Sequence, residues 1–279
     1  MNVGSPWELD FSRTIIMGVM NITPDSFFDG GQLQSLDQAR LRADELVESG
    51  SDILDIGGES SRPGAEPVSA QEEYARVLPV VRALSQDNRW ISVDTYHADT
   101  ARESIAAGAR MINDITALRG DAAMAEVLSG SDCAVVLMHM LGMPKTMQAD
   151  PVYANVVDDI AAFFDERLNF AVRAGIKEER LWIDPGFGFG KTVEHNLALL
   201  RGLASFRRFG RPILIGTSNK STIGAVLGLP VHERLEGTAA TVAAGIIYGA
   251  DAIRVHDVRA MARVARMTDA IVGKGVQHG

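Results

Sequence analysis

Polar side chains that could bind a ligand recur at one kind of position in this sequence, directly after a short apolar run. A single polar residue there usually caps a helix or fixes a loop. The same pattern after eight successive apolar runs is harder to explain by capping, and it favours one shared binding site. The residues at these run ends are Asn21, Asp55, Asp94, Asn113, Asp114, Met138, His139, Asp184, Ser218, Asn219, Lys220, Arg254 and His256.

Asp94, Asn113 and Asp184 suit a flat heterocycle that presents several N–H groups in one plane. A buried carboxylate needs donors, and an amidine-like or aminopyrimidinone edge supplies them. An internal ion pair with Lys220 is the alternative, and the two interpretations can coexist. Met138 is expected to pack on a flat ligand, because methionine contacts aromatic rings well, although core packing would also explain it.

Cationic and donor groups are expected at the same end of the strands. Arg62, Arg254 and His256, together with Asn21, suit an anionic group such as a diphosphate that arrives with a divalent metal. By itself, a histidine in the position of His256 is more often structural. The prediction therefore depends on these residues meeting at one site.

Three other features could carry chemistry. Asp55 and Asp114 could assist a metal, but their spacing alone does not show it. Residues 186–192 read GFGFGKT, yet only three residues separate Gly186 from the GK pair, where a P-loop has four. Cys133 begins an apolar run with no base beside it, which indicates a buried structural thiol rather than a nucleophile.

The elements that position these residues alternate along the chain. Apolar runs predict strands at 15–20, 53–57, 90–94, 111–114, 134–139, 181–184, 213–216 and 252–255. Helical spacing of apolar residues predicts helices at 36–49, 70–84, 98–107, 122–128, 152–174, 194–203, 234–248 and 259–272. Eight strand–helix units in this length are typical of a parallel (β/α)₈ barrel of the TIM type. We expect one domain over residues 1–279, with 1–13 as an N-terminal extension segment; an open doubly wound sheet is the alternative.

Loop lengths indicate which end of the barrel carries the site. The connections from helix to strand are short, as at 48–52, 107–110 and 174–176. The connections from strand to helix are long and rich in Gly, Pro and polar residues, as at 22–35 and 58–69. In a barrel these longer loops share the C-terminal face, where active sites are built.

Composition and charge exclude several classes of protein. The 279 residues are 46% hydrophobic and 23% charged, which is typical of a globular chain. The formal net charge of −9 argues against broad binding to nucleic acid or to an anionic membrane. Cys133 is the one cysteine, so no intrachain disulfide can form. We find no signal peptide and no apolar stretch long enough to span a membrane, and we expect a cytoplasmic protein.

Several of these segments resemble dihydropteroate synthase, in order and at fitting distances, from about residue 15 to residue 272. The matching motifs are MGVMNITPDSF (17–27), DIGGESSRPGA (55–65), ISVDT (91–95), INDI (112–115), LMHM (137–140), IDPGFGFGK (183–191), SNKS (218–221) and IRVHDV (253–258). The resemblance implies a (β/α)₈ barrel that forms a homodimer. It also implies that 6-hydroxymethyl-7,8-dihydropterin diphosphate and 4-aminobenzoate condense to 7,8-dihydropteroate and diphosphate, a folate-biosynthesis step that sulfonamides inhibit.

The resemblance also implies roles for individual residues. The catalytic set would be Asp94, Asp184, Lys220, Arg254 and His256. The pterin would contact Asp94, Asn113, Met138, Asp184, Phe189, Lys220 and Arg254, and the diphosphate would contact Asn21, Ser61, Arg254 and His256. The 4-aminobenzoate would contact Phe27, Arg62, Pro63 and Ser218, and Asn21 would be the ligand of a Mg²⁺ cofactor. No protein nucleophile is required, which agrees with the lack of a credible Ser–His or Cys–His arrangement.

The sequence departs from the family pattern at three positions. Asn219 stands where an arginine is usual, Ser61 where a threonine is common, and Phe28 where a small polar residue is frequent. The loss of a cation at residue 219 could alter how its loop is anchored. Two alternatives stay open at this point: a non-catalytic paralogue that binds a pterin, and a pterin-dependent methyltransferase, for which the sequence contains no corrinoid-binding region.

Overall fold

The structure is a computed structural model that describes residues 9–22, 32–59, 68–87, 89–142, 147–148 and 150–275, without the side chains of 32–35. Within these ranges, eight parallel strands form one sheet in the order β6-β5-β4-β3-β2-β1-β8-β7. The strands are β1 (Ile15–Asn21), β2 (Ile53–Gly57), β3 (Ile91–Asp94), β4 (Met111–Asp114), β5 (Ala134–Met138), β6 (Leu181–Asp184), β7 (Leu214–Ile215) and β8 (Ala252–Val255).

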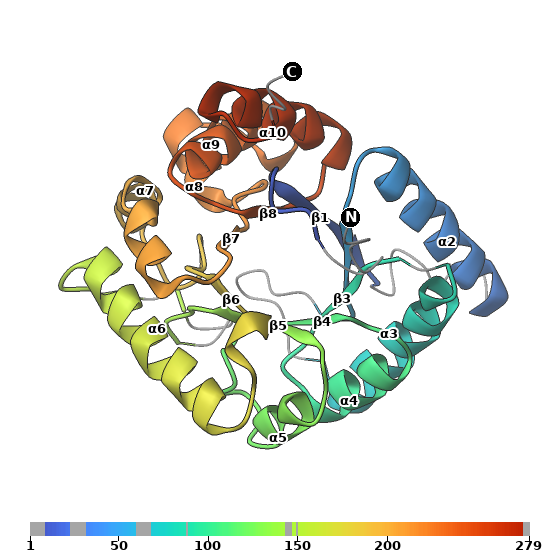
Figure 1. The fold of residues 1–279 in the computed structure, drawn as a ribbon. Coiled ribbons are helices and arrows are strands. Elements are labelled where there is room, and N and C mark those ends of the chain that lie inside the picture. The colour runs from blue at the N-terminus through green and yellow to red at the C-terminus, as the bar shows by residue number, and fades with distance from the viewer. Residues whose placement is uncertain are drawn as a thin grey trace, which may run out of the picture.

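A parallel bridge between Ile183 of β6 and Ile213, next to β7, joins the two edges of this sheet. The sheet therefore closes on itself, and the view along its axis shows a ring of helices around it (Figure 1). The predicted (β/α)₈ barrel is confirmed, and the open doubly wound sheet is excluded. All eight predicted strands are present, with ends that differ by at most one residue from those expected.

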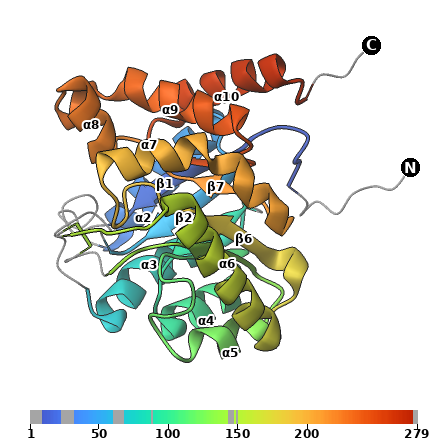
Figure 2. The same cartoon turned by 90° about the vertical axis from the view of Figure 1, so that its left-hand side faces the viewer.

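Helices cover the outside of the barrel (Figures 1 and 2). Those that the structure describes are α2 (Gln32–Glu48), α3 (Ala70–Ser85), α4 (Ala98–Ala106), α5 (Met124–Ser129), α6 (Val156–Arg173), α7 (Val193–Arg201), α8 (Ser221–Leu227), α9 (Leu235–Ile247) and α10 (Val258–Val272). Short 3₁₀ helices lie at Glu178–Arg180, Leu203–Phe209 and Val231–Glu233. The expectation of one helix after each strand was wrong after β7, where α8 precedes α9. Gly224, in the middle of α8, weakens the helical pattern of this segment in the sequence.

Local signals explain where several helices begin. The side chains of Ser69, Asn155, Thr192 and Asp257 each accept a hydrogen bond from a backbone N–H in the first turn of α3, α6, α7 and α10. These bonds satisfy donors that a helix start leaves open. The sequence prediction began α6 at residue 152, but the helix begins after the Asn155 cap.

Two apolar layers hold the barrel together. The larger one lies between the strands and the helices and includes Val77, Leu84, Phe164 and Phe206, all fully buried. The other contains residues from the amino-terminal part of most strands: Ile15, Met17, Ile53, Met111, Val136, Trp182, Leu214 and Ala252. This second layer, the apolar plug, fills one end of the barrel interior. The interior is therefore a packed core at that end rather than a channel.

Candidate active site

One small cavity brings together the residues that the resemblance to dihydropteroate synthase implied as pterin contacts. Its lining includes all seven of them: Asp94, Asn113, Met138, Asp184, Phe189, Lys220 and Arg254. Register explains part of this, because Asp94 pairs with Asn113 across β3 and β4, and Met138 pairs with Asp184 across β5 and β6. This inner cavity measures about 20 Å³, so it holds little more than a water molecule unless the lining side chains move.

Arg254 joins two carboxylates in the wall of the inner cavity. Its Nε donates to Asp55 Oδ2 at 2.6 Å, and its Nη2 donates to Asp94 Oδ2 at 2.8 Å. Burial acts to lower the pKa of Arg254, but the two carboxylates outweigh burial and the pKa is raised. The guanidinium is therefore a fixed positive charge.

The pKa of Asp94, the partner of Arg254, is also raised, but for a different reason. Burial raises the pKa of Asp94, the charge of Arg254 opposes that rise, and the nearby carboxylates of Asp55 and Asp114 add to it. The sequence left open an ion pair between Asp94 and Lys220; the structure pairs Asp94 with Arg254 instead.

Asp184 also lines the inner cavity, and its Oδ1 accepts a hydrogen bond from the N–H of Gly186 at 2.7 Å. Burial raises the pKa of Asp184 to about 6, and the Gly186 N–H and the charge of Lys220 act in the other direction. The Lys220 ammonium lies 4.0 Å from the centre of the Phe189 ring. A ligand ring that packs on Phe189 would therefore meet both a cation and a carboxylate.

The segment 186–191, which superficially resembles a P-loop, has a different role. Lys191 is 3% exposed, and its ammonium donates to the carbonyl oxygens of Gly186 at 2.9 Å and Phe189 at 3.0 Å. It also lies 3.0 Å from Nδ1 of His139, whose pKa burial lowers to about 2. Gly186 has φ +69°, and a Cβ there would overlap the carbonyl oxygen of His139. The loop is closed on itself, and it carries Phe189 into the cavity wall.

A second, wider cavity of about 400 Å³ adjoins the first and shares Phe189, Lys220 and Arg254 with it. Its lining adds Asn21, Ser218 and His256, which the sequence assigned to diphosphate and aminobenzoate. Nδ1 of His256 lies 3.0 Å from the Ser218 hydroxyl, which joins the loops after β7 and β8. The outer cavity thus gathers donors and cations beside the inner one.

The residues that line these two cavities, at the mouth of the barrel, can be compared with the ligands that the expected Mg²⁺ would need. Among the described residues, no group of three or more His, Cys, Asp or Glu could hold a metal ion. Asn21 offers a carboxamide oxygen, which lies beside Gly57, and it lines the outer cavity. Magnesium usually takes few protein ligands and keeps waters and substrate phosphates in its shell. The site fits an ion that arrives with a diphosphate and contacts the chain at Asn21.

Asp114 does not belong to this ligand set, although the sequence left a metal role open for it. One oxygen accepts from the backbone N–H and hydroxyl of Thr116 at 2.7 and 2.6 Å, and the other accepts from the N–H of Leu118 at 2.8 Å. These bonds support Ala117 and Leu118, which have φ of 52° and 65°. Asp114 therefore fixes the turn after β4.

Four predicted contacts, Phe27, Ser61, Arg62 and Pro63, lie outside the described residues. Asp55, for which the sequence left a metal role open, is fully buried and pairs with Arg254. Two residues that the sequence prediction did not include in the site belong near it: Lys191 closes the 186–191 loop, and Arg234 lines the outer cavity. Nothing local in the sequence indicates Arg234.

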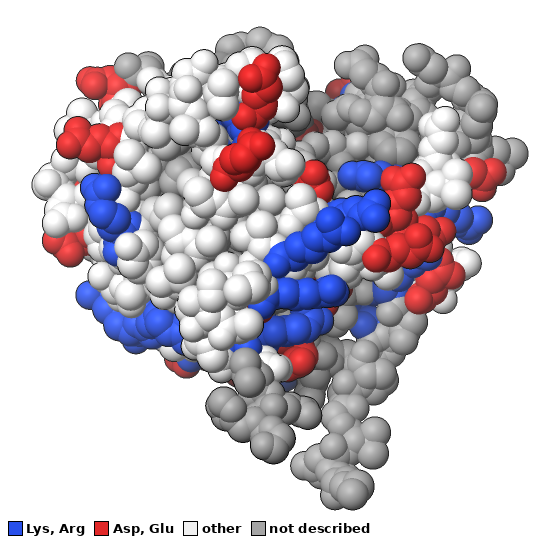
Figure 3. Space-filling model, turned by 90° about the horizontal axis from the view of Figure 1, so that it is seen from above, with Lys and Arg blue, Asp and Glu red and all other residues white. Residues whose placement is uncertain are grey.

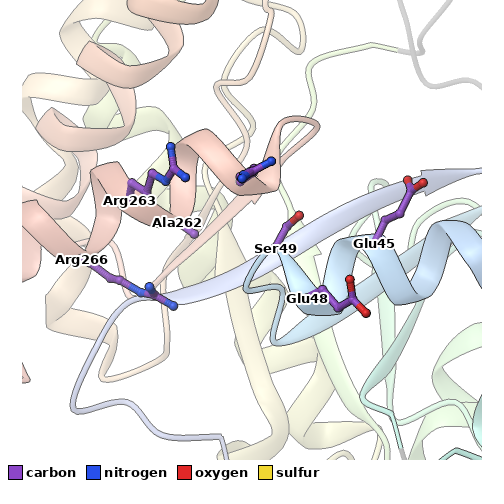
Figure 4. Close-up of a pocket in the computed structure, with 7 residues that line it drawn as sticks. Glu45, Glu48, Ser49, Ala262, Arg263 and Arg266 are labelled. Atoms are coloured by element: carbon purple, nitrogen blue, oxygen red, sulfur yellow. The ribbon is translucent and has the colours of Figure 1, made fainter.

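A further groove lies away from this mouth, on the outer wall between α2 and α10 (Figure 4). Arg263 and Arg266 of α10 and Glu45 and Glu48 of α2 line it from its two sides. It measures about 530 Å³ and includes none of the residues predicted to bind substrate. Its lining comes from the outer faces of two helices rather than from strand ends, where barrel sites are built.

Comparison with known proteins adds independent information. The family model described as "Pterin binding enzyme" matches residues 17–256. The dihydropteroate synthase of Haemophilus influenzae is 48% identical over 263 residues, which cover 94% of this chain and 95% of that protein. Of the helices that the structure describes, none combines the length and apolar character that a membrane crossing needs.

Solved structures agree with the sequence comparison. The Yersinia pestis dihydropteroate synthase in a sulfonamide drug complex superposes with a TM-score of 0.89 at 44% identity, covering 95% of this chain and 96% of that one. The Burkholderia cenocepacia enzyme complexed with 7,8-dihydropteroate superposes with a TM-score of 0.87 at 41% identity, covering 96% and 94%. With the barrel and its polar mouth, these matches confirm the resemblance found in the sequence: the chain belongs to the dihydropteroate synthases, a family of pterin-binding enzymes.

Proposed function

We propose that this chain condenses 6-hydroxymethyl-7,8-dihydropterin diphosphate with 4-aminobenzoate to form 7,8-dihydropteroate and diphosphate. The observation that carries the proposal is the inner cavity, where two carboxylates, a carboxamide and two cations meet Phe189 at the strand ends. Family membership supports the same reaction, and the comparisons contain nothing in favour of a non-catalytic paralogue.

Asp184, Asn113 and Asp94 are the proposed contacts of the pterin edge. Asp184 lines the inner cavity, and its Oδ1 accepts a hydrogen bond from the Gly186 N–H. Its Oδ2 can accept from the N–H groups of an aminopyrimidinone ring. Met138 and Phe189 supply the apolar faces between which the ring would pack. Lys220 then has to leave the Phe189 ring or share it with the pterin.

In the proposed mechanism, the bond to the leaving group breaks before the new bond forms. The C–O bond to diphosphate breaks with its electron pair leaving on the diphosphate, and a cation forms at the pterin methylene. The buried carboxylates of Asp94 and Asp184 stabilise this charge electrostatically. The neutral amine of 4-aminobenzoate attacks the methylene, and the N–H proton is then lost. Arg254 is held by Asp55 and Asp94, so it serves as a fixed charge for both substrate parts.

Asn21, Ser61, Arg254 and His256 are the proposed diphosphate contacts, and Asn21 would also contact Mg²⁺. When bound, the metal would supply charge neutralisation at the departing diphosphate. The protein contributes a donor surface that is already assembled: His256 is oriented by its contact with Ser218, and Arg254 by two carboxylates. Phe27, Arg62, Pro63 and Ser218 are the proposed contacts of 4-aminobenzoate.

A homodimer is the proposed assembly, with α8 and α9 as its surface. Large apolar side chains are exposed there: Val226, Leu227, Val231, Leu235 and Ile247, between 42% and 57%. Figure 3 shows this side of the molecule, where Lys and Arg form a band and a broad area carries neither cations nor carboxylates. Such a patch favours burial against a second copy.

The cytoplasm is the proposed compartment. The substrates and the single thiol of Cys133 support it.

The decisive experiment measures diphosphate release from purified protein with Mg²⁺ and the dihydropterin diphosphate, with and without 4-aminobenzoate. Release that depends on 4-aminobenzoate, with dihydropteroate formed, is expected. Tight binding of the pterin diphosphate without product would instead favour the non-catalytic paralogue.

A further inference from the structure

The loop of residues 216–221 carries two proposed contact residues, Ser218 and Lys220, but its own strand holds it weakly. β7 has two residues, which pair with Ala252 and Ile253 of β8. Towards β6 there is a single bridge, at Ile213. The position of this loop must therefore be determined by other contacts.

Besides the Thr217–Thr241 and Ser218–His256 contacts, two hydrogen bonds hold the backbone of Asn219. Its N–H donates to the Thr238 hydroxyl at 3.1 Å, and its carbonyl oxygen accepts from Arg234 Nη1 at 3.0 Å. The N–H belongs to the peptide that follows Ser218, and the carbonyl to the peptide that precedes Lys220. The two bonds thus orient both contact residues. Asn219 has φ +58°, a left-handed conformation that asparagine tolerates better than most side chains, arginine included.

Arg234 is itself held in place. Its Nε donates to the carbonyl oxygen of Leu229 at 3.3 Å, and its guanidinium packs flat against Gly224 of α8. A Cβ at Gly224 would lie 2.6 Å from Nε of Arg234, so only glycine leaves room for this packing. Arg234 also lines the outer cavity together with Ser218, Lys220 and His256. Its hydrogen bonds to Leu229 and Asn219, however, go to backbone carbonyls.

We propose that Arg234 is a positioning residue for the synthase reaction. From its place just before α9, it holds the Asn219 peptide so that Lys220 lies over Phe189 and Ser218 meets His256. This inference rests on the proposed function and extends it to a residue that touches no substrate. It also explains how the loop stays anchored when residue 219 is not an arginine.

The test compares three variants that release the loop in different ways. Arg234→Lys keeps the charge but loses the planar fork. Thr238→Val removes the other anchor at nearly constant shape, and Gly224→Ala displaces an unchanged Arg234. Arg263→Lys, on an exposed surface of α10, and Gly130→Ala, whose new Cβ would make only ordinary contacts, are the matched controls.

The readouts are KM for each substrate, kcat, the Kd for dihydropterin diphosphate by calorimetry, and Tm. We expect Arg234→Lys and Gly224→Ala to raise KM and Kd about tenfold, because misplacement of a binding loop weakens every contact it makes. Thr238→Val should raise them about threefold, and both controls should match the wild type. Thr238→Ser, which retains the hydroxyl, should restore wild-type values.

Two outcomes would overturn the proposal. A lower Tm with unchanged KM and Kd would show that Arg234 only stabilises the packing of α8 and α9. A large effect of Arg234→Lys with none from Gly224→Ala would show direct contact with substrate. If the wild type binds the pterin diphosphate but forms no product, the proposed function fails, and the Kd ratios still decide the role of Arg234.

Discussion

The two ends of the barrel interior are built from the same strands, two residues apart. At one end lie Ile53, Met111 and Trp182 of the apolar plug. Two residues further along β2, β4 and β6 stand Asp55, Asn113 and Asp184. Side chains at i and i+2 of a strand point the same way, so the interior changes from apolar to polar within about 7 Å.

The apolar end contributes to the stability of the fold, whereas the polar end is arranged for binding. The apolar plug gains free energy by removing large side chains from water. The polar end contains two buried oxygens, Asp55 Oδ1 and Asn113 Oδ1, that find no hydrogen-bond partner among the described residues. Each such group costs about 1–3 kcal/mol. The polar end therefore lowers stability in the free protein, and Asn113 Oδ1, in the lining of the inner cavity, is an acceptor ready for a ligand.

Removal of divalent metal gives the largest expected effect, and it should act at the polar end alone. With EDTA present, turnover should fall to the uncatalysed background, because the diphosphate loses its neutralising cation. Tm should not change, since no preformed metal cluster exists among the described residues. Added Mg²⁺ in excess should restore turnover. Full activity in metal-free buffer would remove Mg²⁺ from the proposal.

Trp182→Ala tests the other end. Loss of this buried side chain from the apolar plug should lower the free energy of unfolding by about 3–5 kcal/mol. Chemical denaturation measures this change, and Met111→Leu, which nearly preserves volume, should cost less than about 1.5 kcal/mol. At a temperature where Trp182→Ala is folded, kcat/KM should stay within about threefold of wild type. A collapse of kcat/KM in a folded variant would show that the two ends are not separable.

Asp184→Asn applies the converse change two residues away. It keeps the shape but removes the carboxylate that we propose accepts from the pterin, so kcat/KM should fall about 100-fold or more while the protein stays folded. Lys220→Ala should act in the same direction. Steady-state kinetics with circular dichroism as the folding control measures both. Wild-type rates in either variant would mean that its assigned role is wrong.

The pH dependence of stability is the smallest effect and reports on the polar end. Burial raises the pKa of Asp184 from an ordinary 3.8 to about 6. The folded protein thus holds a proton that the unfolded chain releases, and the free energy of unfolding falls as pH rises from about 4 to about 6. Asp184→Asn should lack this loss and gain about 1–3 kcal/mol over wild type across that window. Parallel stability curves for the two proteins would contradict this account.

The order of strands, the barrel and the residues of the inner cavity followed from the sequence. Short apolar runs and the polar residues at their ends are local signals, and they placed Asp94, Asn113 and Asp184 at strand ends, where the structure has them. Closure of the sheet then brings strand ends together, whichever helices lie between. The extra helix α8 was missed because its seven residues are too few for a clear helical period.

Pairing inside the site could not be derived in this way. The sequence indicates that Asp55, Asp94, Lys220 and Arg254 lie at the same end of the barrel. It does not indicate which carboxylate pairs with which cation. The geometry decided that Arg254 takes both Asp55 and Asp94 while Lys220 lies over Phe189. It also decided that Lys191 closes its own loop and that Arg234 reaches the Asn219 peptide from 15 residues away. Residue types and spacing determine which groups arrive at the barrel mouth, because strand periodicity is local. Which groups touch depends on side-chain reach and burial, which exist only once the barrel has closed.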